Sequence, residues 1–290
     1  MRESKNFDAS AVPKKYPNIA KIFDKEWFES EFRKEKEKIH LLARQFTYGE
    51  ENRISLHLID HLEEYLETMK DEIKRNRKHF YKSLREDQYT STSAEIEIAS
   101  LFKNMGFRQV ELEPPIPDPP DPKKKGKAGD IKIIDAETEV FIEVRTIKGK
   151  KGEIVDKGER VAIRIMESHK PIDLQNKIED EIHGLSKNNP GIIALYLDPS
   201  IINDRDILKA FYDGIAWVVN GEIVLIEKGE SVMNNTIISA ILLYSPYFGD
   251  GCKIDKELYL NPKAKIPLPE SFITKFKEGG IEIKEEPIEL

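Results

Sequence analysis

The sequence predicts an α/β domain built on a mixed sheet flanked by helices, preceded by an α-helical N-terminal module. Two observations predict this class: apolar residues recur at helical spacing through the first part of the chain, and strand-like runs interrupted by a helical segment begin near Phe107. The length of 290 residues allows two domains, and a hydrophobic content of 39% supports a core in the second. We expect the helical module at residues 1–90, the α/β domain at 91–265 and a C-terminal tail at 266–290.

The N-terminal module is predicted to be a helical hairpin. The apolar residues of its first helix are Trp27, Phe28, Phe32, Ile39, Leu42 and Phe46, and Gly49 ends the run. The second helix starts with Leu58, Ile59, Leu62, Leu66 and Met69. His57 and His61 lie one helical turn apart on this second helix, but no third ligand is identifiable and we assign no metal to them.

The later part of the second helix is basic. Its cations, with Tyr81 among them, suit a surface that tracks phosphate groups. The alternative is a solvated helix face with interspersed acidic residues, which is the commoner use of such a charge run. The cations are Lys70, Lys74, Arg75, Arg77, Lys78, Lys82 and Arg85.

The α/β domain is predicted to open with a helix over residues 93–105, because four apolar residues from Ile98 to Met105 form a stripe and Gly106 fits a left-handed C-terminal cap. A strand follows Phe107. Asn220 and Gly221 between two apolar runs predict a hairpin that extends the sheet. The other expected elements are strands at residues 129–134, 140–145, 191–197, 237–244 and 258–260, and helices at 171–184, 204–212 and 270–277.

Two carboxylates and a cation fall at the ends of neighbouring predicted strands. Side chains alternate along a strand, so Glu143 and Arg145 point to one face, and Asp130 can meet Glu143 across the turn. Mg²⁺ prefers hard oxygen donors, keeps several waters and leaves room for a phosphate oxygen. A cation beside such a pair would steady an attacking water or a developing negative charge. The pattern therefore predicts a site that cuts phosphodiester bonds.

Glu95 adds a third acidic group. On a helix it shares a face with Ile98, whereas Glu97 aligns with Ser100. A carboxylate on the packing side needs a partner, such as a metal ion. The alternative is a capping box, in which Glu95 reaches back to the backbone amide of Thr92. The sequence leaves these two interpretations open.

The order of these features resembles the PD-(D/E)XK nuclease superfamily, in particular its archaeal Holliday-junction-resolvase and restriction-endonuclease-like branch. The resemblance covers about residues 90–200 and implies a restriction-endonuclease-like mixed sheet. It also implies a hydrolase that depends on Mg²⁺ or Mn²⁺. Glu95, Asp130 and Glu143 would then be metal ligands or their supports, and with Arg145 they form the expected catalytic set.

Arg145 stands where the superfamily has its catalytic lysine. Arginine stays charged and cannot accept a proton, so the substitution is not conservative. Three options stay open: Arg145 acts electrostatically, the role of the lysine has moved to Lys132 or Lys148, or the protein does not cut. The alternative function is therefore a catalytically inactive nuclease-fold protein that binds nucleic acid or a protein partner.

A proline-rich stretch, residues 114–122, leads into a lysine cluster beside the predicted site. Proline density excludes regular structure there. We favour a basic loop that grips a nucleic-acid backbone over a surface insertion that packs against nothing. The resemblance also turns Gln175 or Lys177 toward the site, although a solvated face is the commoner use of such positions. The predicted nucleic-acid contacts are Lys123, Lys124, Lys125, Lys127, Lys148 and Gln175.

Composition limits the partners. A net charge of -7 and a pI near 5.6 argue against a protein that coats DNA, so contacts with nucleic acid, expected to be DNA, must come from local basic patches. No apolar run approaches the ~20 residues of a membrane span, and no secretion signal is evident. The single cysteine, Cys252, excludes an internal disulfide and fits the cytoplasm. We expect no membrane partner, and the resemblance adds a homodimer, because many such nucleases work as dimers.

Overall fold

The structure is a computed structural model, and its chain divides into two compact units, Met1–Asn104 and Met105–Leu290. The described residues are 11–35, 38–49, 53–86, 88–121, 123, 128–147, 178, 180–197, 215–219, 222–227, 235–246 and 254–284.

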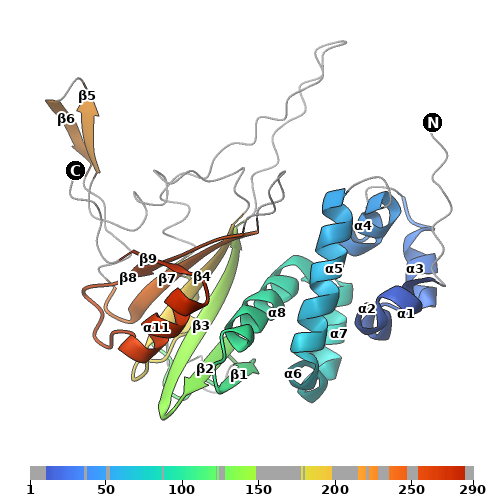
Figure 1. Cartoon of the computed structure of the whole chain (residues 1–290), viewed down its shortest axis with the longest axis horizontal. Helices are drawn as coiled ribbons and strands as arrows, with labels where there is room; N and C mark the ends of the chain where they lie inside the picture. Colours follow the sequence, from blue (N-terminus) through green and yellow to red (C-terminus); the bar gives the residue numbers. More distant parts are fainter. Residues whose placement is uncertain are drawn as a thin grey trace. The chain divides into compact units, whose positions relative to one another are not determined.

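The first unit is helical, as the sequence predicts, and its described part contains no strand (Figure 1). Its division from the second unit falls at Asn104 and not at residue 90, because the last helix packs against α5 and α7. The helices are α1 (Val12–Lys15), α2 (Pro17–Ile22), α3 (Lys25–Glu31), α4 (Leu41–Gly49), α5 (Arg53–Thr68), α6 (Lys70–Arg75), α7 (Arg77–Arg85) and α8 (Tyr89–Asn104).

The predicted first helix of the hairpin is wrong in its middle, where α3 and α4 are separate helices. The break surrounds Glu31, which is only 3% exposed. Its carboxylate accepts hydrogen bonds from the backbone N–H of His40 at 3.0 Å and from Lys34 Nζ at 2.5 Å. A buried carboxylate needs such donors, and wrapping the turn around Glu31 supplies them.

The capping-box interpretation of Glu95 is also wrong. Helix α8 begins at Tyr89, and the N–H of Thr92 already donates within the helix, to the carbonyl of Gln88 at 2.9 Å. Glu97, assigned to the outer face, is the buried acid at 9% exposure, and its Oε1 accepts from the hydroxyl of Tyr65 at 3.1 Å. The face opposite Ile98 is therefore buried too, because α5 and α7 pack on it within this unit.

The second unit carries a seven-stranded mixed sheet in the order β1-β2-β3-β4-β7-β8-β9. The first three strands form an antiparallel meander, β4 and β7 run parallel to β3, β8 is antiparallel to β7, and β9 is parallel to β8. The strands of this sheet are β1 (Gln109–Leu112), β2 (Ile131–Asp135), β3 (Thr138–Ile147), β4 (Gly191–Leu197), β7 (Ile238–Pro246), β8 (Ile254–Leu260) and β9 (Glu282–Lys284).

Two expectations for this unit need correction. The hairpin β5 (Ile215–Val219) and β6 (Glu222–Glu227) forms as predicted, but as a separate two-stranded sheet that does not extend the main one. Residues 266–290 are not merely a tail, because they supply helix α11 (Glu270–Glu278) and the edge strand β9. The predicted helix at 204–212 lies outside the described residues.

Two helical segments of the second unit contribute apolar side chains to its core. Phe272 and Phe276 of α11, drawn against the sheet in Figure 1, contact the ring of Phe107 at centroid distances of 5.1 and 5.5 Å. On another side, the segment ending in the 3₁₀ helix η4 (Ile182–Gly184) packs against Phe141 of β3. Because side chains alternate along β3, Glu143 and Arg145 share the face of Phe141, and this segment covers Glu143.

The described helices include none with both the length and the apolar character that a membrane crossing requires.

Candidate functional site

Asp130 and Glu143 meet at the start of β2. Ile131 pairs with Ile142, so Asp130 comes level with Glu143 on the adjacent antiparallel strand. The backbone N–H of Asp130 donates to Oε1 of Glu143 at 3.3 Å, and the N–H of Val144 donates to Oδ2 of Asp130 at 2.7 Å. The structure thus brings the two predicted carboxylates together, and each is fixed by a backbone amide of the other's strand.

Two glycines leave room for the carboxylate of Glu143, which is only 6% exposed. A Cβ on Gly184 would overlap this carboxylate, and a Cβ on Gly129 would lie 2.9 Å from its Oε1. Both positions are buried. Glycine is therefore required at 184 by close approach of the η4 backbone to the acid, not by a left-handed turn.

Burial raises the pKa of Asp130 to about 6, from an ordinary value of 3.8. The hydrogen bond from Val144 opposes the rise, the charges of Glu181 and Glu113 add to it, and Arg145 counteracts them. Glu113 has a backbone φ of +53°, a left-handed conformation that costs free energy in a non-glycine residue. Such strain is typical of functional sites, and here it accompanies an acidic cluster.

Arg145 is held by Glu181, with its Nη1 2.8 Å from Oε1 of that carboxylate. Glu181 directly precedes η4. Asp130, Glu143, Glu113, Glu181 and Arg145 form what we call the acidic cluster, in which the charges of Glu181, Glu113 and Arg145 act on Asp130, and Glu143 accepts from its backbone N–H. Acidic groups that raise one another's pKa favour a bound cation or a shared proton.

Lys132, one of the two candidates for a displaced lysine, is engaged elsewhere. Its Nζ lies 3.0 Å from Oε2 of Glu111 and 3.2 Å from Oε1 of Glu139, on the strands to either side. Burial acts to lower the pKa of Lys132, but the hydrogen bonds to these two acids outweigh it and the pKa rises. Lys132 is thus a cross-strand ion-pair residue. Lys148, the other candidate, lies outside the described residues.

A third carboxylate for the metal is not found. In the part of the chain that the structure describes, no three side chains of His, Cys, Asp or Glu form a group that could hold a metal ion. Glu95 is half-buried on α8 of the first unit, whereas Asp130 and Glu143 belong to the second unit. The remaining donor set still fits Mg²⁺ or Mn²⁺, because hard cations of this kind bind through one or two carboxylates and keep several waters.

The proline-rich stretch does pack, contrary to the idea of an insertion without contacts. Ile116 is 2% exposed, and Asp118 accepts a hydrogen bond from the hydroxyl of Ser186 at 2.6 Å. The stretch is closed at its base, where the N–H of Gly129 donates to the carbonyl of Pro114 at 2.8 Å. Its start is therefore anchored beside Asp130.

Of the predicted nucleic-acid contacts, Lys123 is described and exposed. Lys124, Lys125, Lys127, Lys148 and Gln175 lie outside the described residues, as does Lys177.

Sequence reasoning missed Glu113 and Glu181. Glu113 directly follows β1, and only the hydrogen bond from its N–H to the carbonyl of Asp130, at 2.9 Å, reveals its place. Glu181 had a usable signal, since it lies one helical turn after Lys177, whose face was already expected to turn toward the site.

No protein family, curated protein or solved structure matches this chain. The case for a function therefore rests on the residues of the site and on the order of the elements that carry them.

Proposed function

We propose that this protein is a PD-(D/E)XK-like enzyme that hydrolyses phosphodiester bonds of nucleic acid, expected to be DNA, with Mg²⁺ or Mn²⁺. The observation that carries the proposal is the Asp130–Glu143 pair, fixed on adjacent strands within an acidic cluster in which the pKa of Asp130 is raised to about 6. Burial and neighbouring acids disfavour the ionised form of such carboxylates, and a bound cation would stabilise that form.

The order of elements supports the same proposal. A helix precedes an antiparallel meander of three strands, a helical segment follows, and β4 then returns parallel to β3. The restriction-endonuclease-like core has this order, and its acids lie on the second and third strands. In this chain Asp130 directly precedes β2 and Glu143 lies on β3, and this placement supports the proposal.

Each residue has a role in the proposed reaction. Asp130 and Glu143 would hold the ion, which supplies Lewis-acid stabilisation of charge on the phosphate. The amides of Asp130 and Val144 keep the two carboxylates oriented. Arg145, positioned by Glu181, would stabilise the negative charge that develops on the phosphate oxygens. Its role would be electrostatic and not that of a base, because a guanidinium cannot take a proton.

Two observations favour a second candidate function. Glu143 lies beneath the backbone of Gly184 and Arg145 is already paired with Glu181, so the arrangement also suits an inactive site that keeps its architecture. Such a protein would bind nucleic acid or a protein partner without cutting.

Cleavage assays separate the two functions. We expect Mg²⁺- or Mn²⁺-dependent cutting of linear, branched or single-stranded DNA, or of RNA, and its loss in Glu143→Gln. Glu139→Gln, on the same strand but paired with Lys132, is the matched control and should cut normally. Absence of cutting on every substrate, with binding unchanged in Glu143→Gln, would favour the inactive protein.

A further inference from the structure

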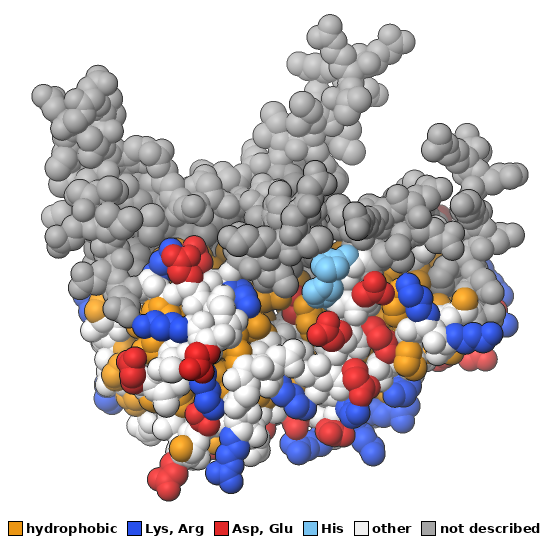
Figure 2. All heavy atoms as spheres, in the orientation of Figure 1, with side chains coloured by type: hydrophobic (Ala, Val, Ile, Leu, Met, Phe, Trp, Pro, Cys, Tyr) orange, Lys and Arg blue, Asp and Glu red, His pale blue; other side chains and the backbone are white. Residues whose placement is uncertain are grey.

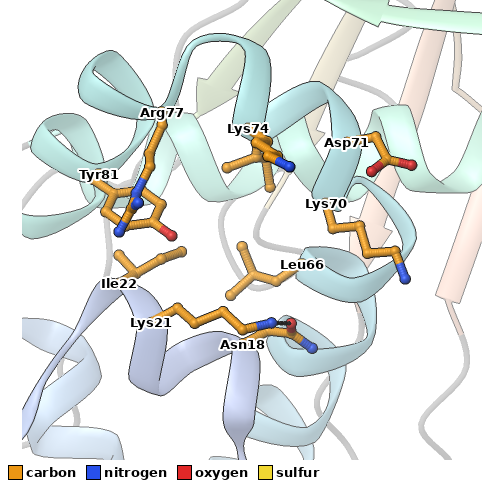
Figure 3. A pocket seen from close by; sticks show the side chains of 10 residues that line it. Asn18, Lys21, Ile22, Leu66, Lys70, Asp71, Lys74, Arg77 and Tyr81 are labelled. Atoms are coloured by element: carbon orange, nitrogen blue, oxygen red, sulfur yellow. Dashed lines mark hydrogen bonds between the residues drawn. The ribbon is translucent and has the colours of Figure 1, made fainter.

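A cavity of about 380 Å³ opens in the helical unit, between α2 and the consecutive helices α5, α6 and α7 (Figure 3). All of its lining residues lie between Asn18 and Tyr81. It is therefore separate from the acidic cluster, and a ligand bound in it would not depend on the proposed nuclease activity.

The lining is strongly basic. Four cations reach it, Lys21, Lys70, Lys74 and Arg77, against the single acid Asp71. Lys70 is paired with Glu67, whose Oε1 lies 2.5 Å from its Nζ, so Lys21, Lys74 and Arg77 carry most of the basic character of the lining, in a chain whose net charge is -7. In Figure 2, Lys and Arg side chains, with some Asp and Glu among them, gather along the edge of the helical part where Figure 1 draws α6. Such local charge attracts an anion.

Part of this basic lining is built by specific contacts. The side chain of Glu63 accepts from the backbone N–H of Asn18 at 2.9 Å and from its Nδ2 at 2.7 Å, which fixes the Asn18 amide. The Oδ1 of Asn18 then accepts from Lys21 Nζ at 2.8 Å, the bond drawn in Figure 3. Asn18 is only 8% exposed, so the acceptor that holds the Lys21 ammonium is a buried, fixed side chain.

The cavity also has an apolar and aromatic wall. Ile22, Leu66 and Ile73 line it beside the ring of Tyr81. The guanidinium of Arg77 lies over one face of this ring, 4.6 Å from its centroid, so the two side chains form a stacked pair at the wall of the cavity. Figure 3 shows Arg77 and Tyr81 side by side at one end and Lys21 at the opposite side.

We propose that this cavity binds a phosphorylated ligand of the nucleotide class, with its phosphates on the lysines and Arg77 and its flat ring against Tyr81. Its volume lies in the range of small-ligand sites, and apolar and aromatic side chains stand beside the charged groups in its lining, as they do in such sites. Lysine ammonium groups and an arginine fork are the usual phosphate donors. A free nucleotide and the 5′-phosphorylated end of a nucleic-acid strand share this chemistry.

Calorimetric titration of the full chain with ATP, with inorganic tripolyphosphate and with 5′-phosphorylated or 5′-hydroxyl oligonucleotides tests the proposal. We expect ATP to bind, and Lys74→Glu to weaken it at least tenfold. Lys78→Glu is the matched control, because Lys78 is an exposed cation that does not line the cavity and its replacement changes the net charge by the same amount. Tyr81→Ala should weaken ATP and leave tripolyphosphate unchanged. Helical circular dichroism and thermal unfolding verify that each variant is folded.

The titrations with ATP and with the two oligonucleotides distinguish a free nucleotide from the end of a nucleic-acid strand. Tighter binding of ATP than of either oligonucleotide identifies a free nucleotide, and a preference for the 5′-phosphorylated strand over the 5′-hydroxyl strand identifies a strand end. The proposal is overturned if no phosphate compound binds. It is equally overturned if Lys74→Glu and Lys78→Glu weaken binding by the same factor, which would describe a generally basic helix surface.

Discussion

Arg145 of β3 and Glu181, just before η4, form an ion pair with 2.8 Å between Nη1 and Oε1. The pair links the strand that carries Glu143 to the segment whose Gly184 covers it. Arg145 is the one cation among the five residues of the acidic cluster, and its position depends on Glu181, a residue 36 positions away in the sequence.

Changing this pair should alter the chemistry in a defined direction. If the proposed function holds, Arg145→Lys should retain or raise Mg²⁺-dependent cleavage, because it places at this position the lysine that the proposed PD-(D/E)XK-like site would use and keeps the charge beside Glu181. Glu181→Gln should lower the pKa of Asp130, since the charge of Glu181 is one cause of its rise. Nuclear magnetic resonance titration of the Asp130 carboxyl carbon measures that pKa. A higher pKa in Glu181→Gln would contradict the role given to Glu181.

The raised pKa of Asp130 predicts a pH-dependent stability. A group whose folded pKa lies above its unfolded value stabilises fully below the unfolded value, here 3.8, and loses this contribution as pH rises through about 6. The loss amounts to up to about 3 kcal/mol for a shift of this size. Asp130→Asn keeps an acceptor for Val144 and should remove the loss, so the variant should be more stable than the wild type at pH 8 and not at pH 4. Denaturant unfolding at both pH values checks this, and an equal difference at the two would contradict it.

The close approach of Gly184 to Glu143 gives a prediction for a double-mutant cycle. Gly184→Ala should destabilise by roughly 1–3 kcal/mol, because the added methyl overlaps the Glu143 carboxylate and forces a shift in a packed site. In a Glu143→Ala background the space is vacated, and the same change should cost much less. Urea unfolding of the four proteins measures the coupling. Additive costs would mean that Gly184 is required for another reason.

A prediction for the helical unit concerns Tyr65. Its hydroxyl lies 2.7 Å from Nδ1 of His61 and donates to Glu97 at 3.1 Å. Tyr65→Phe removes a bond to a buried carboxylate and should cost about 1–3 kcal/mol. Burial, then the charge of His57, lowers the pKa of His61, so stability should fall as pH drops below 6.5. His61→Gln should flatten this pH dependence in thermal unfolding, and an unchanged profile would contradict the assignment.

Local patterns in the sequence predicted much of the fold, and two of the four acids of the acidic cluster together with its arginine. Alternation along β3 and the short turn before it were enough to bring Asp130 to Glu143. Glu113 and Glu181 escaped because their positions depend on tertiary register: one follows β1 in a left-handed conformation, and the other arrives on the crossover to β4. Likewise, the run of cations was predicted, but on one long helix, which is wrong because the structure divides it into α5, α6 and α7. The cavity also needs Lys21 from α2, which no local pattern joins to Lys74.

Helix positions failed for a related reason. The periodicity of α8 distinguishes an apolar stripe from the rest of the surface only if one side faces water. Because α5 and α7 pack on α8, Glu97 and Ser100 are buried as well, and the helix has no polar face at their positions. The polar turn around Glu31 was hidden in the same way, since apolar spacing continues across it from Phe28 to Leu42.

The proposed activity requires Asp130 and Glu143 together to hold one divalent cation, and Mn²⁺ titration followed by electron paramagnetic resonance measures this binding. We expect one Mn²⁺ per chain, an affinity that increases as pH rises through about 6 with deprotonation of Asp130, loss of binding in Glu143→Gln, and normal binding in Glu139→Gln. Absence of bound Mn²⁺ at pH 8, or equal binding by Glu143→Gln and the wild type, would contradict the metal site.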